Sequence, residues 1–305
     1  MKWILSVLIV IYFVSCSPDR DKPPPPAPPT DSLGGWQKIP TSITSALDIV
    51  FVNPAKGYLA GRGLYESLDS GKTWKLLQSV ANGNVTTINF MNSQNGYFVG
   101  DNYGFTINSG NNWTTLNTSN GAIDVYFTST TVGCKAGTNG IDRTVDTGRT
   151  WTRVLSQPMS SLNFVDANNG WAGGSNKIFK TENGGVTWVE THTGTYGDVY
   201  AIQFTNANNG WFVGLGDNAI YKTTNAGNNW QRIPIAGSPY DLHFINDNLG
   251  YVVTAGGTIL KTTNGGNSWT QDAKVVGGVF IEVFFLDANH GWAVTLNGTV
   301  LRWKR

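Results

Sequence analysis

The chain alternates short runs of apolar or β-branched residues with clusters of Asn, Asp and Gly. Between residues 241 and 272 the runs are DLHFI, GYVVTA, GTILKTT and SWTQD, and each gap between them carries Asn, Asp or Gly. Strand formers bounded by residues that tolerate turn geometries are typical of short β-strands joined by tight turns. This stretch therefore predicts four antiparallel strands.

The same arrangement recurs with a period of about 40 residues, carried by two markers. The first is Ser/Thr-x-Asp/Asn-x-Gly-x-x-Trp, which occurs six times and ends at Trp74, Trp113, Trp151, Trp188, Trp230 and Trp269. The second is a Phe followed six positions later by Gly and usually an aromatic residue; it occurs seven times and begins at Phe51, Phe90, Phe127, Phe164, Phe204, Phe244 and Phe285. We number the repeats one to seven by this second marker. Four strands in each repeat predict one propeller blade.

The two ends of the repeat region are complementary. The last repeat finishes with GTVLRWKR, which aligns with GTILKTT of the sixth and supplies only three strands. Trp36 lies 38 residues before Trp74, in register with the other marker tryptophans. We therefore predict an all-β fold, a seven-bladed β-propeller of four-stranded antiparallel blades over residues 35–305, closed by the N-terminal strand joining the C-terminal blade. Such closure removes exposed sheet edges.

The first fifteen residues, MKWILSVLIVIYFVS, predict a signal peptide with one lysine, an apolar run and a small residue before Cys16. This junction resembles a bacterial lipoprotein cleavage site, so we expect Cys16 to carry lipid. The alternative is an ordinary secretory signal with an incidental cysteine. Residues 16–34 include the run PPPPAPP, which is typical of an extended linker. Lipidation of Cys16 would leave Cys134 as the one remaining cysteine, for which we expect a buried apolar role.

Composition narrows the function classes. The 305 residues are 13% charged and 12% aromatic, with 37 glycines and 12 tryptophans, which favours an all-β class. A net charge of +1 gives no global field for nucleic acid or an anionic membrane. We therefore expect no nucleic-acid partner, no cofactor and a monomer.

The first marker resembles the Asp-box, or BNR repeat, of sialidases and sortilins. That resemblance implies that the Asp or Asn binds backbone amides of its own hairpin and that the Trp packs between sheets. The wider arrangement of Phe-x5-Gly-Trp/Tyr, Gly-x-Ile and Lys-Thr-x-Asn-Gly-Gly-x-x-Trp resembles the photosystem II stability and assembly factor family, in a non-photosynthetic bacterial relative. This resemblance covers about residues 35–305, and it implies a propeller that binds proteins.

Sialidases share the Asp-box, so a glycosidase remains the alternative class. Their chemistry requires a cluster of arginines for the substrate carboxylate. On the face opposite the boxes, only Arg62 stands in a connecting loop of this sequence. Most tryptophans are already used by the two markers. We therefore expect no catalytic residues, and keep a glycan-binding or sialidase-like propeller as the second interpretation.

Two charged groups are candidate sites. Three residues before the marker Phe of repeats six, seven and one stand Asp241, Glu282 and Asp48, which ring closure would bring together at one channel mouth. They could hold a cation or a basic side chain, or bind neighbouring backbone amides. Directly before the box Ser/Thr in repeats three to six stand Arg143, Lys180, Lys222 and Lys261, and Arg302 holds the aligned position in repeat seven; we call these five residues the basic arc. The family resemblance implies that this arc binds a partner; the alternative is solvated lysines at strand ends.

The sequence thus predicts a non-enzymatic lipoprotein scaffold or assembly factor in the cell envelope, at the outer membrane, in the periplasm or on the surface. Its partner would be a protein or a surface polymer, with the N-terminal lipid as the membrane contact. We place the arc and the acidic group on opposite faces of the ring.

Overall fold

The computed structural model describes residues 30–77, 80, 83–116 and 121–303. The predicted signal peptide of residues 1–15, the lipidation site Cys16 and the linker up to residue 29 lie outside these ranges. Asp31–Arg305 form one compact unit, which contains all the named secondary-structure elements, and all of these elements are strands.

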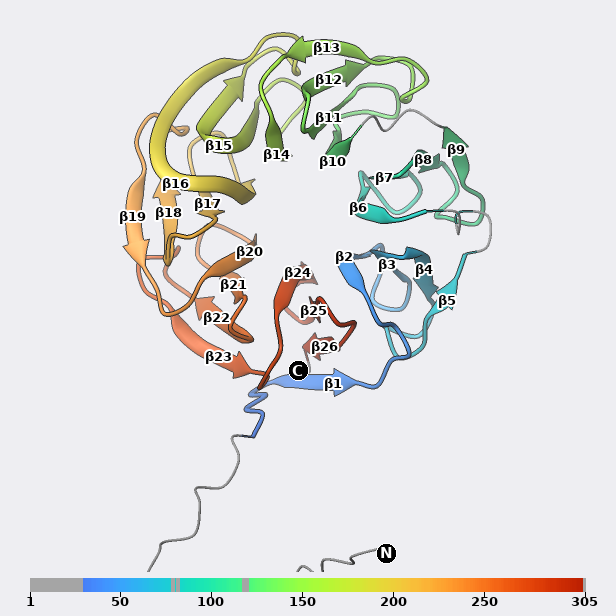
Figure 1. Cartoon of the computed structure of the whole chain (residues 1–305), viewed down its shortest axis with the longest axis vertical. Coiled ribbons are helices and arrows are strands. Elements are labelled where there is room, and N and C mark those ends of the chain that lie inside the picture. Colours follow the sequence, from blue (N-terminus) through green and yellow to red (C-terminus); the bar gives the residue numbers. More distant parts are fainter. Residues whose placement is uncertain (1–29, 78–79, 81–82, 117–120, 304–305) are drawn as a thin grey trace, which may run out of the picture. The chain divides into compact units, whose positions relative to one another are not determined.

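Repeats one to three each form one antiparallel sheet of four strands (Figure 1). Repeat one contains β2 (Ala46–Phe51), β3 (Gly57–Gly61), β4 (Gly63–Ser67) and β5 (Lys75–Leu76). Repeat two contains β6 (Val85–Phe90), β7 (Gly96–Gly100), β8 (Tyr103–Thr106) and β9 (Thr114–Leu116). Repeat three contains β10 (Ala122–Phe127), β11 (Gly133–Gly137), β12 (Gly140–Thr144) and β13 (Thr152–Leu155).

Repeats four and five share one sheet of six strands. Its members are β14 (Met159–Phe164), β15 (Gly170–Thr181), β16 (Val189–Phe204), β17 (Gly210–Gly214), β18 (Ala219–Thr223) and β19 (Gln231–Pro234). Repeat six contains β20 (Pro239–Phe244), β21 (Gly250–Thr254), β22 (Thr258–Thr262) and β23 (Thr270–Lys274). The last sheet contains β24 (Phe280–Asp287), β25 (His290–Thr295), β26 (Val300–Trp303) and β1 (Trp36–Ile39).

The predicted count of seven blades is therefore wrong, because hydrogen bonding gives six sheets. The cause is β16, whose 16 residues pair with β15 on one side and with β17 on the other. Its segment THTGTYGD lies where the other repeats turn. The register with β15 shifts there and Gly197 has a positive φ of 75°, yet Asp198 pairs again with Ser175 of β15. Thr and Tyr favour strands, and no Pro interrupts the segment. Two repeats consequently merge into one continuous sheet.

The ends of the ring meet as predicted. β1 pairs antiparallel with β26 in the register Trp36↔Trp303 to Ile39↔Val300. A further bridge joins Ser32 to Lys274 of β23. The N-terminal residues of this unit therefore contact the last two sheets in the chain, which closes the ring.

The second marker is explained by the pairing of the two inner strands in each repeat. Phe51 stands directly opposite Gly57, and a Cβ on this glycine would lie 2.5 Å from the Phe51 ring. The ring can cover the neighbouring strand only because the glycine has no side chain. The same Phe↔Gly register recurs in all the other repeats.

Backbone hydrogen bonds define two faces of the ring. The turns that carry the first marker, which we call box turns, bind the loops of the second marker, as in Ser70 N to Ala55 O and Gly265 N to Asn248 O. We call this side the box face. On the opposite face, the loop after the second strand binds the loop before the innermost strand, as in Leu296 N to Val279 O.

Candidate functional site

The basic arc occupies equivalent places at the box-face ends of the strands. Lys180 lies with its ammonium 5.7 Å from the ring centroid of Trp171, the aromatic residue of its own marker. The other four members share one register across the sheet, in the pairs Arg143↔Cys134, Lys222↔Trp211, Lys261↔Tyr251 and Arg302↔Trp292. The structure thus places all five residues on the box face, one in each of repeats three to seven.

Two members of the arc bind the box turn of the next repeat. Arg143 Nε donates to the carbonyl oxygen of Gly184 at 2.7 Å, and Lys222 Nζ donates to Asn267 Oδ1 at 2.9 Å. Both side chains are half-buried. These contacts cross from one repeat to the next, so the two cations also stabilise the ring.

The lysines on either side of Lys222 in the arc have local partners. Lys180 Nζ lies 2.6 Å from Glu182 Oε1, within the fourth box turn. Lys261 Nζ lies 5.5 Å from the ring centroid of Tyr251 and 5.1 Å from that of Trp303. The ammonium group of Lys180 is therefore paired with a carboxylate, whereas that of Lys261 lies beside two aromatic rings.

The marker aromatics explain why Arg143 is an arginine. Trp171 stacks on Phe204 of the next repeat with ring centroids 3.6 Å apart, and its indole N–H donates to Ala226 O at 3.0 Å. Repeat three has Cys134 at this position, which is buried and too small to reach across. Arg143, opposite Cys134, supplies the missing donor to the box turn of repeat four. Sequence reasoning did not detect this structural role.

The first marker has the hydrogen bonding that its resemblance implied. In the third box turn, Asp146 Oδ1 accepts the backbone N–H of Thr150 at 2.9 Å, and Thr144 Oγ accepts that of Gly148. The hydroxyl and the backbone N–H of Thr150, which both donate to the carboxylate, lower the pKa of Asp146 to about 2. Asn183 makes the equivalent contact to Thr187 N at 2.9 Å in the fourth turn. The third and fourth box turns therefore share the same hydrogen bond, from the backbone N–H of the residue before the box Trp to the box Asp or Asn.

The acidic group lies on the innermost strands and binds backbone across repeats. Asp48 Oδ2 accepts the N–H of Ile88 at 2.8 Å, and Asp241 Oδ2 accepts that of Val283 at 2.9 Å. β24, which carries Glu282, lies between β20 and β2 (Figure 1), so the three predicted carboxyls share one side of the ring. Asp124, which the sequence interpretation left out, makes the same bond to Leu162 N at 2.7 Å.

Burial raises the pKa values of this group. It raises the pKa of Asp48 and of Asp241 to about 7, and that of Asp124 to about 6. The pKa of Glu282 lies well above its usual value because of burial and the nearby charges of Asp241 and Asp48. Within the described ranges, no three His, Cys, Asp or Glu side chains stand close enough together to hold a metal ion.

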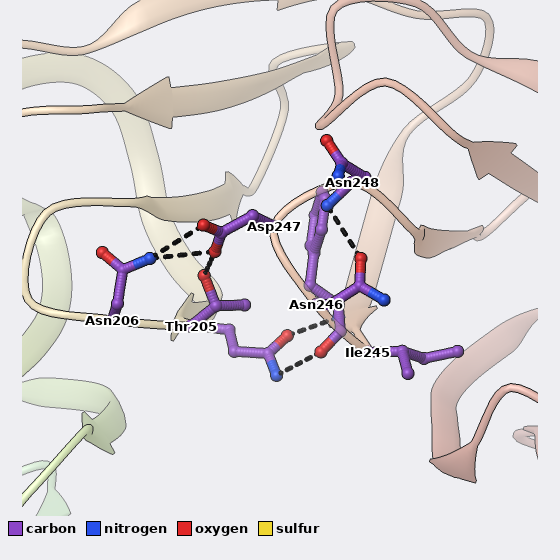
Figure 2. A pocket seen from close by; sticks show the side chains of 8 residues that line it. Thr205, Asn206, Ile245, Asn246, Asp247 and Asn248 are labelled. Atoms are coloured by element: carbon purple, nitrogen blue, oxygen red, sulfur yellow. Dashed lines mark hydrogen bonds between the residues drawn. The ribbon is translucent and has the colours of Figure 1, made fainter.

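An open pocket of about 600 Å³ lies on the box face between the marker loops of repeats five and six. Figure 2 shows Thr205 and Asn206 directed toward Asp247 of the neighbouring loop. Asn206 Nδ2 donates to both Asp247 oxygens at 2.9 and 3.0 Å, and Asn209 Nδ2 adds a bond at 2.9 Å. The lining consists of Gln203, Thr205, Asn206, Phe244, Ile245, Asn246, Asp247 and Asn248. The only signal in the sequence is an Asp at a loop position that holds Ala in repeats four, five and seven.

No helix long and apolar enough to cross a membrane is present in the part of the chain that the structure describes.

A ring of antiparallel sheets closed by its own N-terminal strand, with a box turn joining the last two strands of six repeats, is a BNR-type β-propeller. The model of the family described as "Photosynthesis system II assembly factor YCF48" matches residues 154–271 and 237–304. Among curated proteins, none matches the chain by sequence.

Solved structures share the fold. The structure of YCF48 bound to D1 peptide is 22% identical, with a TM-score of 0.74 over 91% of this chain and 99% of that one. YCF48 from Cyanidioschyzon merolae is 18% identical, with a TM-score of 0.71 over 88% and 98%. A catalytically inactive virginiamycin B lyase from Staphylococcus aureus with quinupristin is 14% identical, with a TM-score of 0.73 over 88% and 98%. The fold is thus shared by binding proteins and enzymes.

Proposed function

We propose that this chain is a lipid-anchored scaffold of the bacterial cell envelope that binds a segment of another protein and catalyses no reaction. The observation that carries the proposal is the ring shared with YCF48, whose structure with a D1 peptide has a TM-score of 0.74 to this chain. A fold alone does not fix a function. The choice of surface therefore rests on the basic arc, and the choice of location on the predicted signal peptide and Cys16.

The chemistry of the arc favours an acidic segment as the partner. Its cations stand at one position of successive repeats, which suits an extended chain that runs along the box face. Three of the five are lysines, which bind carboxylates as point charges rather than in the bidentate geometry of arginine. Binding should therefore weaken with salt, because the Debye length is only about 10 Å at 0.1 M ionic strength.

Charge reversal in the native cell tests the proposal. We expect the variant Lys222→Glu/Lys261→Glu/Arg302→Glu to lose the protein that is cross-linked to the wild-type chain. The matched control, Lys38→Glu/Lys75→Glu/Lys177→Glu, makes the same change in net charge at lysines outside the basic arc and should retain it. Retention by the first variant, with a normal melting temperature, would contradict the proposal.

A glycan is the second candidate, favoured by the pocket at Asp247. Amide and carboxylate side chains line it, and such groups hydrogen-bond sugar hydroxyls. Asp247→Ala should then abolish binding of envelope polysaccharide in a calorimetric titration and leave the cross-linked protein unchanged. Equal polysaccharide binding by the variant and the wild type would exclude this pocket.

A further inference from the structure

The box turns of three consecutive repeats carry exposed aliphatic residues at the same position. The residue after the box Ser/Thr is Leu68, Ile107 or Val145 in repeats one to three, and these side chains are 65%, 65% and 60% exposed. We call them the tip residues. In repeats four to six the position is occupied by Glu182, Thr224 and Thr263. Aliphatic residues at equivalent exposed places are a regular feature of one half of the ring.

The tips stand apart from one another. They lie in the turns that join β4 to β5, β8 to β9 and β12 to β13, in successive sectors of the ring (Figure 1). Repeat four also exposes an aliphatic side chain, but at a different position of its box turn: Val186 is 50% exposed. The apolar area is therefore divided among separate protruding turns on the box face.

Exposed cations accompany two of the tips. Lys72 and Arg149 each stand four residues after a tip residue, and both are exposed. The guanidinium of Arg149 lies 5.8 Å from the ring centroid of Phe105, near the second tip. The acidic residues of these turns, Asp69 and Asp146, direct their carboxylates to the amides and hydroxyls of Thr73 and Thr150. Aliphatic and cationic groups thus dominate the exposed parts of these two turns.

We propose that the box face of repeats one to four docks on a phospholipid bilayer that contains anionic lipid. Leu68, Ile107 and Val145 would enter the boundary of the acyl chains, while Lys72 and Arg149 would contact phosphate groups. A protein interface has a contiguous packed centre, rich in aromatic residues and arginine, and separate aliphatic tips do not supply one. Fluid lipid fills the space between protruding residues, and cations nearby are attracted to its negative surface.

The proposal uses the predicted lipid anchor only to hold the ring near the bilayer. Residues 16 to 31 span at most about 50 Å when fully extended, which lets either face of the ring reach the surface. Docking through repeats one to four would also place the basic arc of repeats three to seven close to the headgroups. A partner would then be met at the membrane surface, which the proposed function by itself does not require.

A fluorophore on a tip tests the orientation in the full chain. We would attach it at Ile107→Cys, or at Leu296→Cys as the control, reconstitute each protein in vesicles, and measure quenching by a nitroxide-bearing lipid. Leu296 lies on the opposite face, is close to Ile107 in size and is 48% exposed, against 65% for Ile107. Cys134 is buried and contributes no label, and the wild-type chain measures the background from Cys16.

Strong quenching at Ile107 with little at Leu296 would support the proposal. Equal quenching at both positions, or stronger quenching at Leu296, would overturn it. Absence of quenching at Ile107 would also overturn it and would leave a protein as the occupant of this face.

Substitution of the tips gives an independent measure. In a Cys16→Ser background, Leu68→Ser/Ile107→Ser/Val145→Ser should lower the partition coefficient onto phosphatidylcholine and phosphatidylglycerol vesicles by roughly 100-fold, about fivefold for each side chain. The control Leu215→Ser/Leu296→Ser should change it by less than about twofold. Equal partitioning of the two variants would contradict the proposal. These vesicles contain no protein, so the outcome is separate from that of the charge-reversal test on the basic arc.

Discussion

Trp36→Ala should open the ring at its closing strand. Trp36 is 4% exposed, and its ring meets those of Tyr251, Phe285 and Trp303 edge-on, with centroids 6.1, 5.6 and 5.5 Å away. Its indole N–H donates to Asp272 Oδ2 at 2.8 Å. All four partners belong to repeats six and seven, more than 200 residues away in the chain. The side chain therefore fastens the N-terminal strand to the last two sheets.

The contacts set the size of the effect. Truncation of a buried tryptophan to alanine costs about 3–5 kcal/mol, and the lost hydrogen bond adds roughly 1 kcal/mol. For a domain of this size, 1 kcal/mol corresponds to about 2–3 °C in melting temperature. We therefore expect Trp36→Ala to melt roughly 10–15 °C below the wild type. An exposed edge on β26 should also promote aggregation of the variant.

Thermal unfolding followed by circular dichroism measures the shift, and Trp36→Phe is the matched control. Phenylalanine keeps an aromatic ring among the same partners but has no donor for Asp272, so it should lose much less stability than alanine. A melting temperature for Trp36→Ala within about 3 °C of the wild type would refute the reasoning. So would equal losses in the two variants, because the packing of the closing strand would then contribute nothing.

Three further outcomes are expected. The pKa values of Asp48 and Asp241 are raised to about 7 each, so between about pH 4 and 7 the folded state keeps protons that the unfolded state has already released. The free energy of unfolding should therefore fall as pH rises from about 4 to 7 and level off above that. Asp48→Asn should flatten this slope in urea titrations, and a slope unchanged by the substitution would contradict the assignment. Burial raises the pKa of Cys134 to about 12, so its thiol should resist alkylation in the folded protein and react on unfolding, which a timed alkylation assay followed by mass spectrometry would check. Arg143→Met should lower the free energy of unfolding by about 1–3 kcal/mol by leaving Gly184 O without its donor. If urea unfolding shows no loss of stability, the contact does not stabilise the ring.

The repeated pattern of the sequence was sufficient for the strand order within most repeats and for ring closure. Each marker fixes a local contact, such as Phe51 over Gly57 or Asp146 on Thr150 N, and local contacts depend on residues close in the chain. Trp36 could be assigned to the last sheet because its spacing from Trp74 repeats the spacing of the other tryptophans. The assignment of Trp36 therefore required no knowledge of contacts between residues far apart in the chain.

Contacts between repeats decided the rest. The sequence predicted seven separate blades, but the first part of β16 pairs with β15 and its last part with β17, so six sheets result. Arg143 was indistinguishable from the other members of the basic arc until Cys134 was seen to leave a gap beside it. The exposure of the tip residues likewise depends on what neighbouring repeats leave uncovered. A repeat pattern specifies the interactions that every repeat makes for itself, whereas the surface available to a partner is set where unlike repeats meet.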